Sequence, residues 1–162
     1  MSETMVARAR LGMGMRFEAS AGSGHRVTLD ASMPDGGQDT GFRPMELLLV
    51  GLAGCTGMDV ISILRKKRQI VTDYEVRVTG KRVETHPMVF EEITIEHIIT
   101  GHQLQPEAIA RAIHLSAERY CGAGAMLGKT ARIIHLFRMI DAATSQALTL
   151  AETRAVSPIS PL

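Results

Sequence analysis

The sequence is poor in aromatic residues and in cysteine. It has no tryptophan, four phenylalanines and two tyrosines among 162 residues, so its core must be aliphatic, supplemented by some of its ten methionines. Cys55 and Cys121 are its two cysteines, and neither belongs to a CxxC or similar ligand spacing. A structural zinc site is therefore not expected, and we predict no metal.

The sequence also has no strong charge imbalance and no long apolar run. Its 18 Lys plus Arg residues nearly balance 17 Asp plus Glu residues, and no long basic block occurs. Nucleic acid is therefore not expected as a partner, because that binding rests mostly on attraction to phosphates. The apolar run over residues 47–52 is interrupted well before the roughly 18 residues of a membrane span. Residues 1–10 lack the apolar stretch of a secretory signal, so we expect a cytoplasmic protein without a membrane partner.

The first third of the chain combines weak strand patterns with one long apolar helix. Residues 6–31 predict two or three strands joined by hairpins, and residues 33–41 predict a loop. Pro44 suits a first helical position and opens a helix that runs to about residue 68. Residues 47–64 are apolar almost all round, which is typical of a helix buried on most sides. One small domain covers such a helix poorly, so we expect a homodimer.

The rest of the chain alternates between strands and helices. Residues 74–80 and 90–99 predict an antiparallel pair of strands, and Pro106 opens an amphipathic helix that ends near Cys121. A short helix over residues 122–128 and a strand over residues 131–140 complete the pattern. We therefore predict a single α+β domain over residues 1–140. The tail, residues 141–162, is predicted to be frayed or disordered.

The two cysteines permit a redox cycle. A thiolate attacked by a peroxide becomes a sulfenic acid, and a second thiol condenses with it to a disulfide that a dithiol reduces. Cys55 lies in the middle of the long helix and needs a cationic neighbour to ionise, whereas Cys121 lies beside glycines that allow close approach. Two cysteines suffice for this cycle, so no cofactor is expected. The alternative is a pair of inert buried thiols.

The segment PMELLLVGLAGCTGMDV, which contains Cys55, and the later segment RYCGAG, which contains Cys121, resemble the OsmC/Ohr family. This is the family of osmotically inducible protein C and the organic hydroperoxide resistance proteins, and the resemblance extends over residues 6–140. It implies an OsmC-like fold, in which antiparallel sheets pack on a long central helix within an intertwined homodimer. It also implies reduction of organic hydroperoxides, with Cys55 as the peroxidatic cysteine, Cys121 as the resolving cysteine and a dithiol as the reductant.

Two further site residues are implied by the resemblance. Family members place an arginine from the N-terminal strands and a glutamate from the start of the long helix beside the peroxidatic sulfur. Arg16 is the nearest match to the arginine, and Glu46 stands one residue after the glutamate position, which Met45 occupies. Glycine also follows Cys121, where the peroxidase branches have proline, so the chain resembles a less characterised branch.

Two other functions remain open at this point. One is a dimeric protein that keeps the scaffold but binds a small apolar ligand without catalysis, and the other is a redox sensor. A Cys-His hydrolase is less favoured because the six histidines show no ligand or catalytic spacing. Asp59, one helical turn after Cys55, is interpreted as a structural acid, since a carboxylate opposes thiolate formation.

Overall fold

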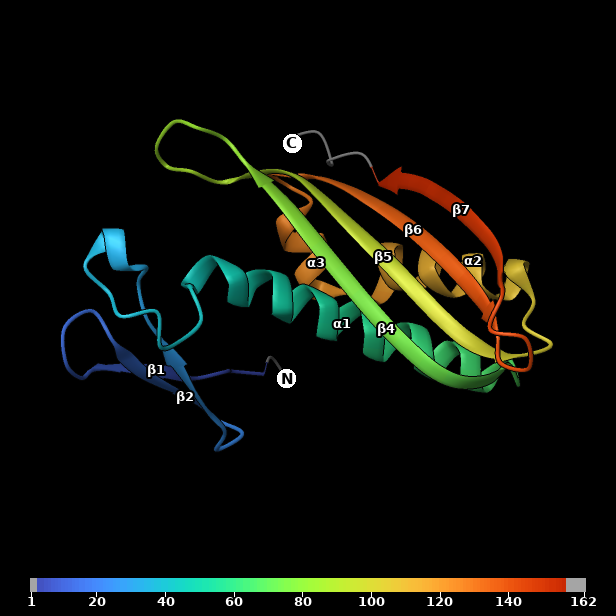
Figure 1. Cartoon of the computed structure of the whole chain (residues 1–162), viewed down its shortest axis with the longest axis horizontal. Helices are drawn as coiled ribbons and strands as arrows, with labels where there is room; N and C mark the ends of the chain where they lie inside the picture. The colour runs from blue at the N-terminus through green and yellow to red at the C-terminus, as the bar shows by residue number, and fades with distance from the viewer. Residues whose placement is uncertain (1–2, 157–162) are drawn as a thin grey trace. The chain divides into compact units, whose positions relative to one another are not determined.

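The computed structural model describes residues 3–156 of the chain (Figure 1). The chain divides into two compact units, Met1–Leu48 and Leu49–Leu162. The sequence predicts one domain over residues 1–140, so the division after Leu48 differs from that expectation. Helix α1, Pro44–Lys66, begins in unit 1 and continues through unit 2.

Unit 1 is a small antiparallel sheet, as the sequence pattern predicts. Its strands β1 (Ala7–Leu11), β2 (Phe17–Ala21) and β3 (Arg26–Leu29) pair in the order β1-β2-β3. Every residue of β1 is exposed, and Asp30 is the one buried residue among residues 3–48. The described residues of unit 1, 3–48, therefore enclose no apolar core in this chain.

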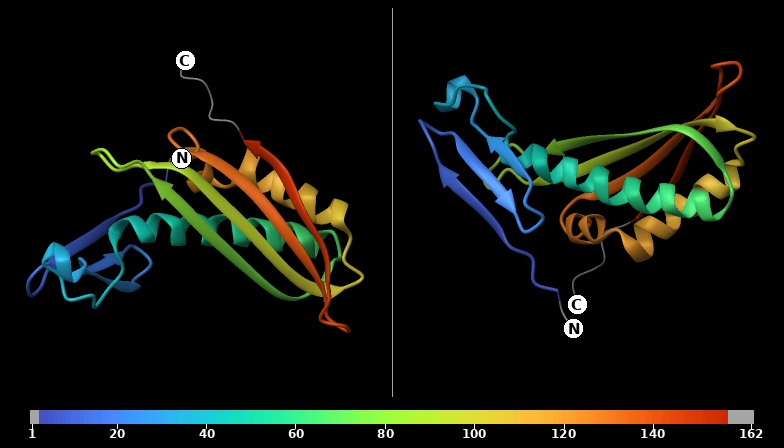
Figure 2. Two further views of the ribbon diagram at one scale, coloured as in Figure 1. Left: turned by 45° about the horizontal axis from the view of Figure 1, so that its top comes forward. Right: turned by 90° about the horizontal axis from the view of Figure 1, so that it is seen from below.

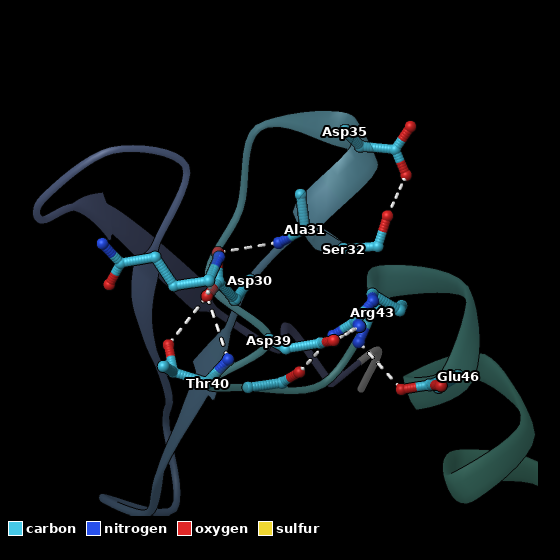
Figure 3. Close-up of polar contacts among 10 residues, drawn as sticks. Asp30, Ala31, Ser32, Asp35, Asp39, Thr40, Arg43 and Glu46 are labelled. Carbon is cyan, nitrogen blue, oxygen red and sulfur yellow. Dashed lines mark hydrogen bonds and ion pairs between the residues drawn. The ribbon is translucent and has the colours of Figure 1, made fainter.

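Asp30 organises the turn-rich segment that follows β3 (Figure 3). Its Oδ2 accepts hydrogen bonds from the Thr40 hydroxyl at 2.7 Å, the Thr40 N–H at 3.0 Å and the Gln38 N–H at 3.1 Å, and its Oδ1 accepts one from the Ala31 N–H at 2.8 Å. These hydrogen bonds, those from Thr40 foremost, lower the pKa of Asp30 to about 2. The predicted loop is thus wrapped around an ionised carboxylate.

Unit 2 is a four-stranded sheet with its helices on one face (Figure 2). Its strands are β4 (Ile70–Arg82), β5 (Phe90–His102), β6 (Arg132–Asp141) and β7 (Ala147–Val156), in the order β4-β5-β6-β7. The predicted antiparallel pair β4 and β5 is confirmed. Strands β5 and β6 pair in parallel, so a crossover must connect them. That crossover contains α2 (Pro106–Leu115), the π-helical turn Ser116–Tyr120 and α3 (Gly122–Leu127).

The core of unit 2 lies between this sheet and its helices. Helix α1 contributes Val60 and Leu64, and α2 contributes Ile109 and Ile113. Strands β5 and β6 contribute Ile99, Phe137 and Met139. This aliphatic packing agrees with the low aromatic content of the chain.

The chain after Asp141 differs from the predicted frayed tail. It turns and forms β7, which pairs antiparallel with β6 from Ile140 opposite Ala147 to Ile133 opposite Val156. The apolar pattern of this segment is too weak to predict a strand. The strand forms because the edge of β6 offers hydrogen-bond partners to it. Residues 157–162 of the predicted tail lie outside the described residues.

Helix α1 is buried on one side only within this chain. Leu52, Thr56, Val60 and Leu64 recur every four residues and form its buried stripe. Val50 and Met58 are 51% and 74% exposed, so the predicted burial on most sides is not reached in the single chain.

Helix α1 also differs from the expectation that no segment is long and apolar enough to span a membrane. The helix has 23 residues, and an 18-residue window within it has a mean hydropathy of 2.0, which meets the requirement for a membrane span by length and composition alone. Its interruptions at Gly54, Thr56 and Asp59 are too few to lower that average. The core helix of a globular domain meets the same requirement, and the buried stripe of α1 packs into the core of unit 2.

Candidate active site

Cys55 and Cys121 come together in unit 2. The Sγ atoms of both cysteines and a carboxylate oxygen of Asp59 all lie within 4.8 Å of one another. Cys55 and Asp59 are one turn apart on α1 and therefore share a face of that helix. Cys121 follows the π-helical turn and precedes α3, where its Sγ accepts a hydrogen bond from the Gly124 N–H at 3.3 Å. Both thiols are free in this structure.

A buried hydroxyl pair connects α1 to the π-helical turn beside these thiols. The Ser116 hydroxyl donates to Asp59 Oδ2 at 3.0 Å and lies 3.3 Å from the Thr56 hydroxyl. Both hydroxyl residues are almost completely buried. Asp59 therefore has the structural partner that the sequence interpretation expects, and its carboxylate also stands next to both sulfurs. Ser116 and Thr56 were not predicted as site residues, because nothing in their local sequence marks them.

The electrostatic environment differs between the two thiols. Burial raises the pKa of Cys121 to about 12, and the contacts with Cys55 and the charge of Asp59 act in the same direction. Cys121 is therefore a neutral thiol at pH 7. Cys55 is partly exposed, and the Asp59 carboxylate is a charged neighbour of its sulfur. A carboxylate beside a sulfur opposes a thiolate there, whereas a cation favours one.

A cavity of about 390 Å³ lies next to the thiols and is within the size range of small-molecule sites. Its wall is mostly apolar or small, and includes Leu52, Ile95, Gly124, Ala125 and Ile133. Cys121 and Thr56 also line it, whereas Cys55 adjoins the wall through its neighbour Thr56 in the sequence. The cavity gives a small, largely apolar molecule access to Cys121.

A series of polar side chains, one half-buried and two buried, reaches the same cavity from the sheet. The Tyr74 hydroxyl is hydrogen-bonded to Nδ1 of His97 at 2.6 Å, and Nε2 of His97 lies 3.3 Å from Nδ1 of His135. His135 lines the cavity, and the His97 and His135 rings are stacked with centroids 5.6 Å apart. Sequence reasoning missed this pair, because the two histidines become neighbours only through the parallel pairing of β5 with β6.

The two histidines are held neutral. Burial lowers the pKa of His97 to about 3, with a further contribution from His135, and burial lowers the pKa of His135 to about 4. At neutral pH this chain of side chains therefore carries no charge beside the cavity.

Arg16 and Glu46, the other two predicted site residues, belong to unit 1. Arg16 lies between β1 and β2, and its Nη2 forms an ion pair with Glu18 Oε1 at 2.7 Å. Glu46 lies in the first turn of α1, and its Oε2 accepts a hydrogen bond from the Arg43 N–H at 2.9 Å, which caps the helix (Figure 3). Their predicted roles beside Cys55 stay predictions.

Comparison with known proteins decides the family. The sequence pattern of the family described as OsmC-like protein matches residues 36–135. Protein YhfA of Escherichia coli (strain K12) is 39% identical to this chain over 138 residues, which are 85% of this chain and 100% of YhfA. The chain belongs to the OsmC-like protein family. The resemblance seen in the sequence is thereby confirmed.

Solved structures confirm the α+β, OsmC-like fold. A hypothetical protein from Aquifex aeolicus superimposes with a TM-score of 0.76 at 32% identity, over 86% of this chain and 98% of that one. An organic hydroperoxide resistance protein from Elizabethkingia anophelis superimposes with a TM-score of 0.66 over 85% of this chain and 96% of that one. Its sequence is only 14% identical to this chain, so the similarity shows a shared fold and does not show a shared function.

The neutral histidines predict that acid destabilises this OsmC-like protein. In the unfolded chain a histidine titrates near 6.5, so between about pH 6.5 and the lowered values of about 3 and 4 the unfolded state binds more protons. Stability is thus lost as pH falls through this window. We expect the free energy of unfolding to fall by about 2 kcal/mol per buried histidine between pH 7.5 and pH 5.

Urea unfolding at the two pH values measures this loss. His97→Gln lowers stability at pH 7.5 but shows a smaller further loss at pH 5, whereas His102→Gln, at an exposed position, keeps the wild-type pH dependence. Equal pH dependence in wild type and His97→Gln would contradict the prediction.

Proposed function

We propose that this protein is a thiol-dependent peroxidase that reduces organic hydroperoxides. The observation that carries the proposal is the separation of at most 4.8 Å between the Sγ atoms of Cys55 and Cys121. A disulfide bond is about 2.05 Å long, so the sulfurs need to approach by less than about 3 Å to form one. The family membership and the names of structural neighbours support the same activity.

The reaction balances with the two thiols and an external dithiol. The Cys55 thiolate attacks the terminal oxygen of a hydroperoxide ROOH, the O–O bond breaks, and the alkoxide takes a proton to leave as ROH. Cys55 is then a sulfenic acid. The Cys121 sulfur attacks that sulfur as its proton transfers to the hydroxyl group of the sulfenic acid, and the hydroxyl group leaves as water. A dithiol then reduces the Cys55–Cys121 disulfide and is itself oxidised to a disulfide.

The surroundings support this division of roles. Cys121 is the buried, neutral thiol, so it does not compete for the first attack, and its proton must be transferred in the second step. The mostly apolar cavity that Cys121 lines favours an organic hydroperoxide over a small polar peroxide. Cys55 is partly exposed, so we assign it as the thiol that attacks the hydroperoxide first.

Substitution of each cysteine separates the two steps. Cumene hydroperoxide added in equal amount to the reduced protein is expected to remove two hydrogens and form the Cys55–Cys121 disulfide, as measured by intact mass and peptide mapping. Cys121→Ser is expected to gain one oxygen at Cys55 without a disulfide. Cys55→Ser is expected to lose turnover with dithiothreitol down to the uncatalysed rate.

The same measurement distinguishes the non-catalytic alternative. Thiols that stay reduced under excess hydroperoxide would contradict peroxidase activity and favour a protein that binds a small apolar ligand. Rapid oxidation without turnover by a dithiol would favour a redox sensor.

We further propose that Arg16 supplies a cation that favours the Cys55 thiolate, with Glu46 positioning it. Arg16 is half exposed and its ion pair with Glu18 is at the surface, so little energy is needed to exchange that partner. In a Cys121→Ser background, Arg16→Ala is expected to slow alkylation of Cys55 at pH 7 about tenfold, which corresponds to one pKa unit. Arg10→Ala, on the exposed strand β1, is the control and is expected to react at the unchanged rate. If Cys121→Ser and its two double variants with Arg16→Ala and Arg10→Ala are alkylated at equal rates, Arg16 does not stabilise the Cys55 thiolate.

The protein is proposed to act as a cytoplasmic homodimer. The exposed apolar side of α1 and the lack of an apolar core in unit 1 support this, because apolar surface of that kind marks an interaction site. Sedimentation velocity is expected to give the mass of two chains, and Met58→Asp is expected to shift the protein toward one chain. Met126→Asp, which changes a similarly exposed methionine on α3, serves as the control. A single-chain mass for the wild-type protein would contradict the homodimer.

A further inference from the structure

We propose that Cys55, Cys121 and Asp59 form a binding site for Zn²⁺ or a similarly soft divalent cation, with a fourth position open to water. This site goes beyond the proposed peroxidase activity, and it stands whether or not the protein turns over hydroperoxides. The sequence predicts no metal because neither cysteine has a ligand spacing along the chain. The fold brings the three ligands together from two separate elements.

The ligand set and its geometry suit zinc. Cys55 and Asp59 are a pair four residues apart on one face of α1, and Cys121 approaches from the junction before α3. Zinc with sulfur ligands at about 2.3 Å and oxygen at about 2.1 Å requires neighbouring ligand atoms roughly 3.6 to 3.8 Å apart in a tetrahedron. The three ligand atoms already lie within 4.8 Å of one another, so shifts of about 1 Å complete that geometry.

The groups around these ligands are arranged as metal sites require. The Ser116 hydroxyl donates to Asp59 Oδ2 at 3.0 Å, which orients the carboxylate beside the two sulfurs. The Gly124 N–H donates to Cys121 Sγ at 3.3 Å, which stabilises a thiolate at that atom. These hydrogen bonds are an observation independent of the ligand distances, and both fix the orientation of a ligand.

The chemistry of the site selects the kind of cation. Two thiolates and one carboxylate favour a soft or borderline ion such as Zn²⁺ over Mg²⁺ or Ca²⁺, which prefer oxygen ligands. Binding replaces one proton on each thiol and transfers no electrons. The cavity that Cys121 lines leaves room for a water molecule at the fourth position. A bound cation occupies both sulfurs, so metal and peroxide compete for the same thiols.

Cobalt and zinc titrations of the reduced, full-length protein test this site under anaerobic conditions. Co²⁺ is expected to give thiolate-to-cobalt charge-transfer absorption and the visible bands of a tetrahedral ion, saturating at one ion per chain. Competition with a chromophoric chelator then measures the Zn²⁺ affinity. Asp59→Asn is expected to weaken Zn²⁺ binding by about tenfold or more. Cys55→Ser and Cys121→Ser are each expected to weaken it further and to reduce the charge-transfer band.

Asp73→Asn is the matched control, because Asp73 is an exposed acid of β4 in the same unit, and it is expected to bind as the wild type does. Absence of a charge-transfer band in the wild-type protein overturns the proposal and requires no variant to fold. Binding that Asp59→Asn leaves unchanged overturns the three-ligand site. Hydroperoxide turnover is measured separately in metal-free protein, so its failure does not bear on the metal site.

Discussion

The contact between α1 and the π-helical turn Ser116–Tyr120 is the constraint on which the site depends. The buried hydroxyls of Thr56 and Ser116 meet there, and Ser116 also holds the Asp59 carboxylate. Because this contact is desolvated, losing it leaves buried polar groups without partners, which costs more than a surface hydrogen bond. It therefore fixes where the chain emerges from the turn, and Cys121, the next residue, is placed against Cys55 on α1.

Negative charge and burial around Cys55, Cys121 and Asp59 disfavour thiolates at the two sulfurs. Burial keeps Cys121 protonated, and Asp59 adds negative charge where a thiolate has to form. Each proposed chemistry therefore brings a cation to these sulfurs. In the proposed peroxidase this cation is a guanidinium that favours the Cys55 thiolate, and in the proposed metal complex it is an ion that binds both sulfurs and blocks their reaction. The two cysteines can serve both proposed processes because the processes differ in the cation that approaches the sulfurs.

The elements of the fold were largely predictable, and their pairing was less so. Proline at the start of α1 and α2, and the alternation along β4 and β5, are local signals that the structure confirms. Strand β7 escaped prediction, because it exists through hydrogen bonds to β6 and its own residues have no clear alternation. The His97–His135 pair escaped for a related reason, since the parallel register of β5 and β6 decides which residues become neighbours.

The sequence by itself determined the types and order of most elements and the family, because these follow from local periodicity and from short segments of residues. Only the tertiary structure decided that Asp59 and Ser116 join the cysteines, that a largely apolar cavity opens beside Cys121, and that α1 keeps an exposed apolar side. The physical reason is that these features depend on contacts between residues distant along the chain. The crossover that connects β5 to β6 brings those residues together, and the local hydrophobic pattern of the sequence does not predict where the crossover runs.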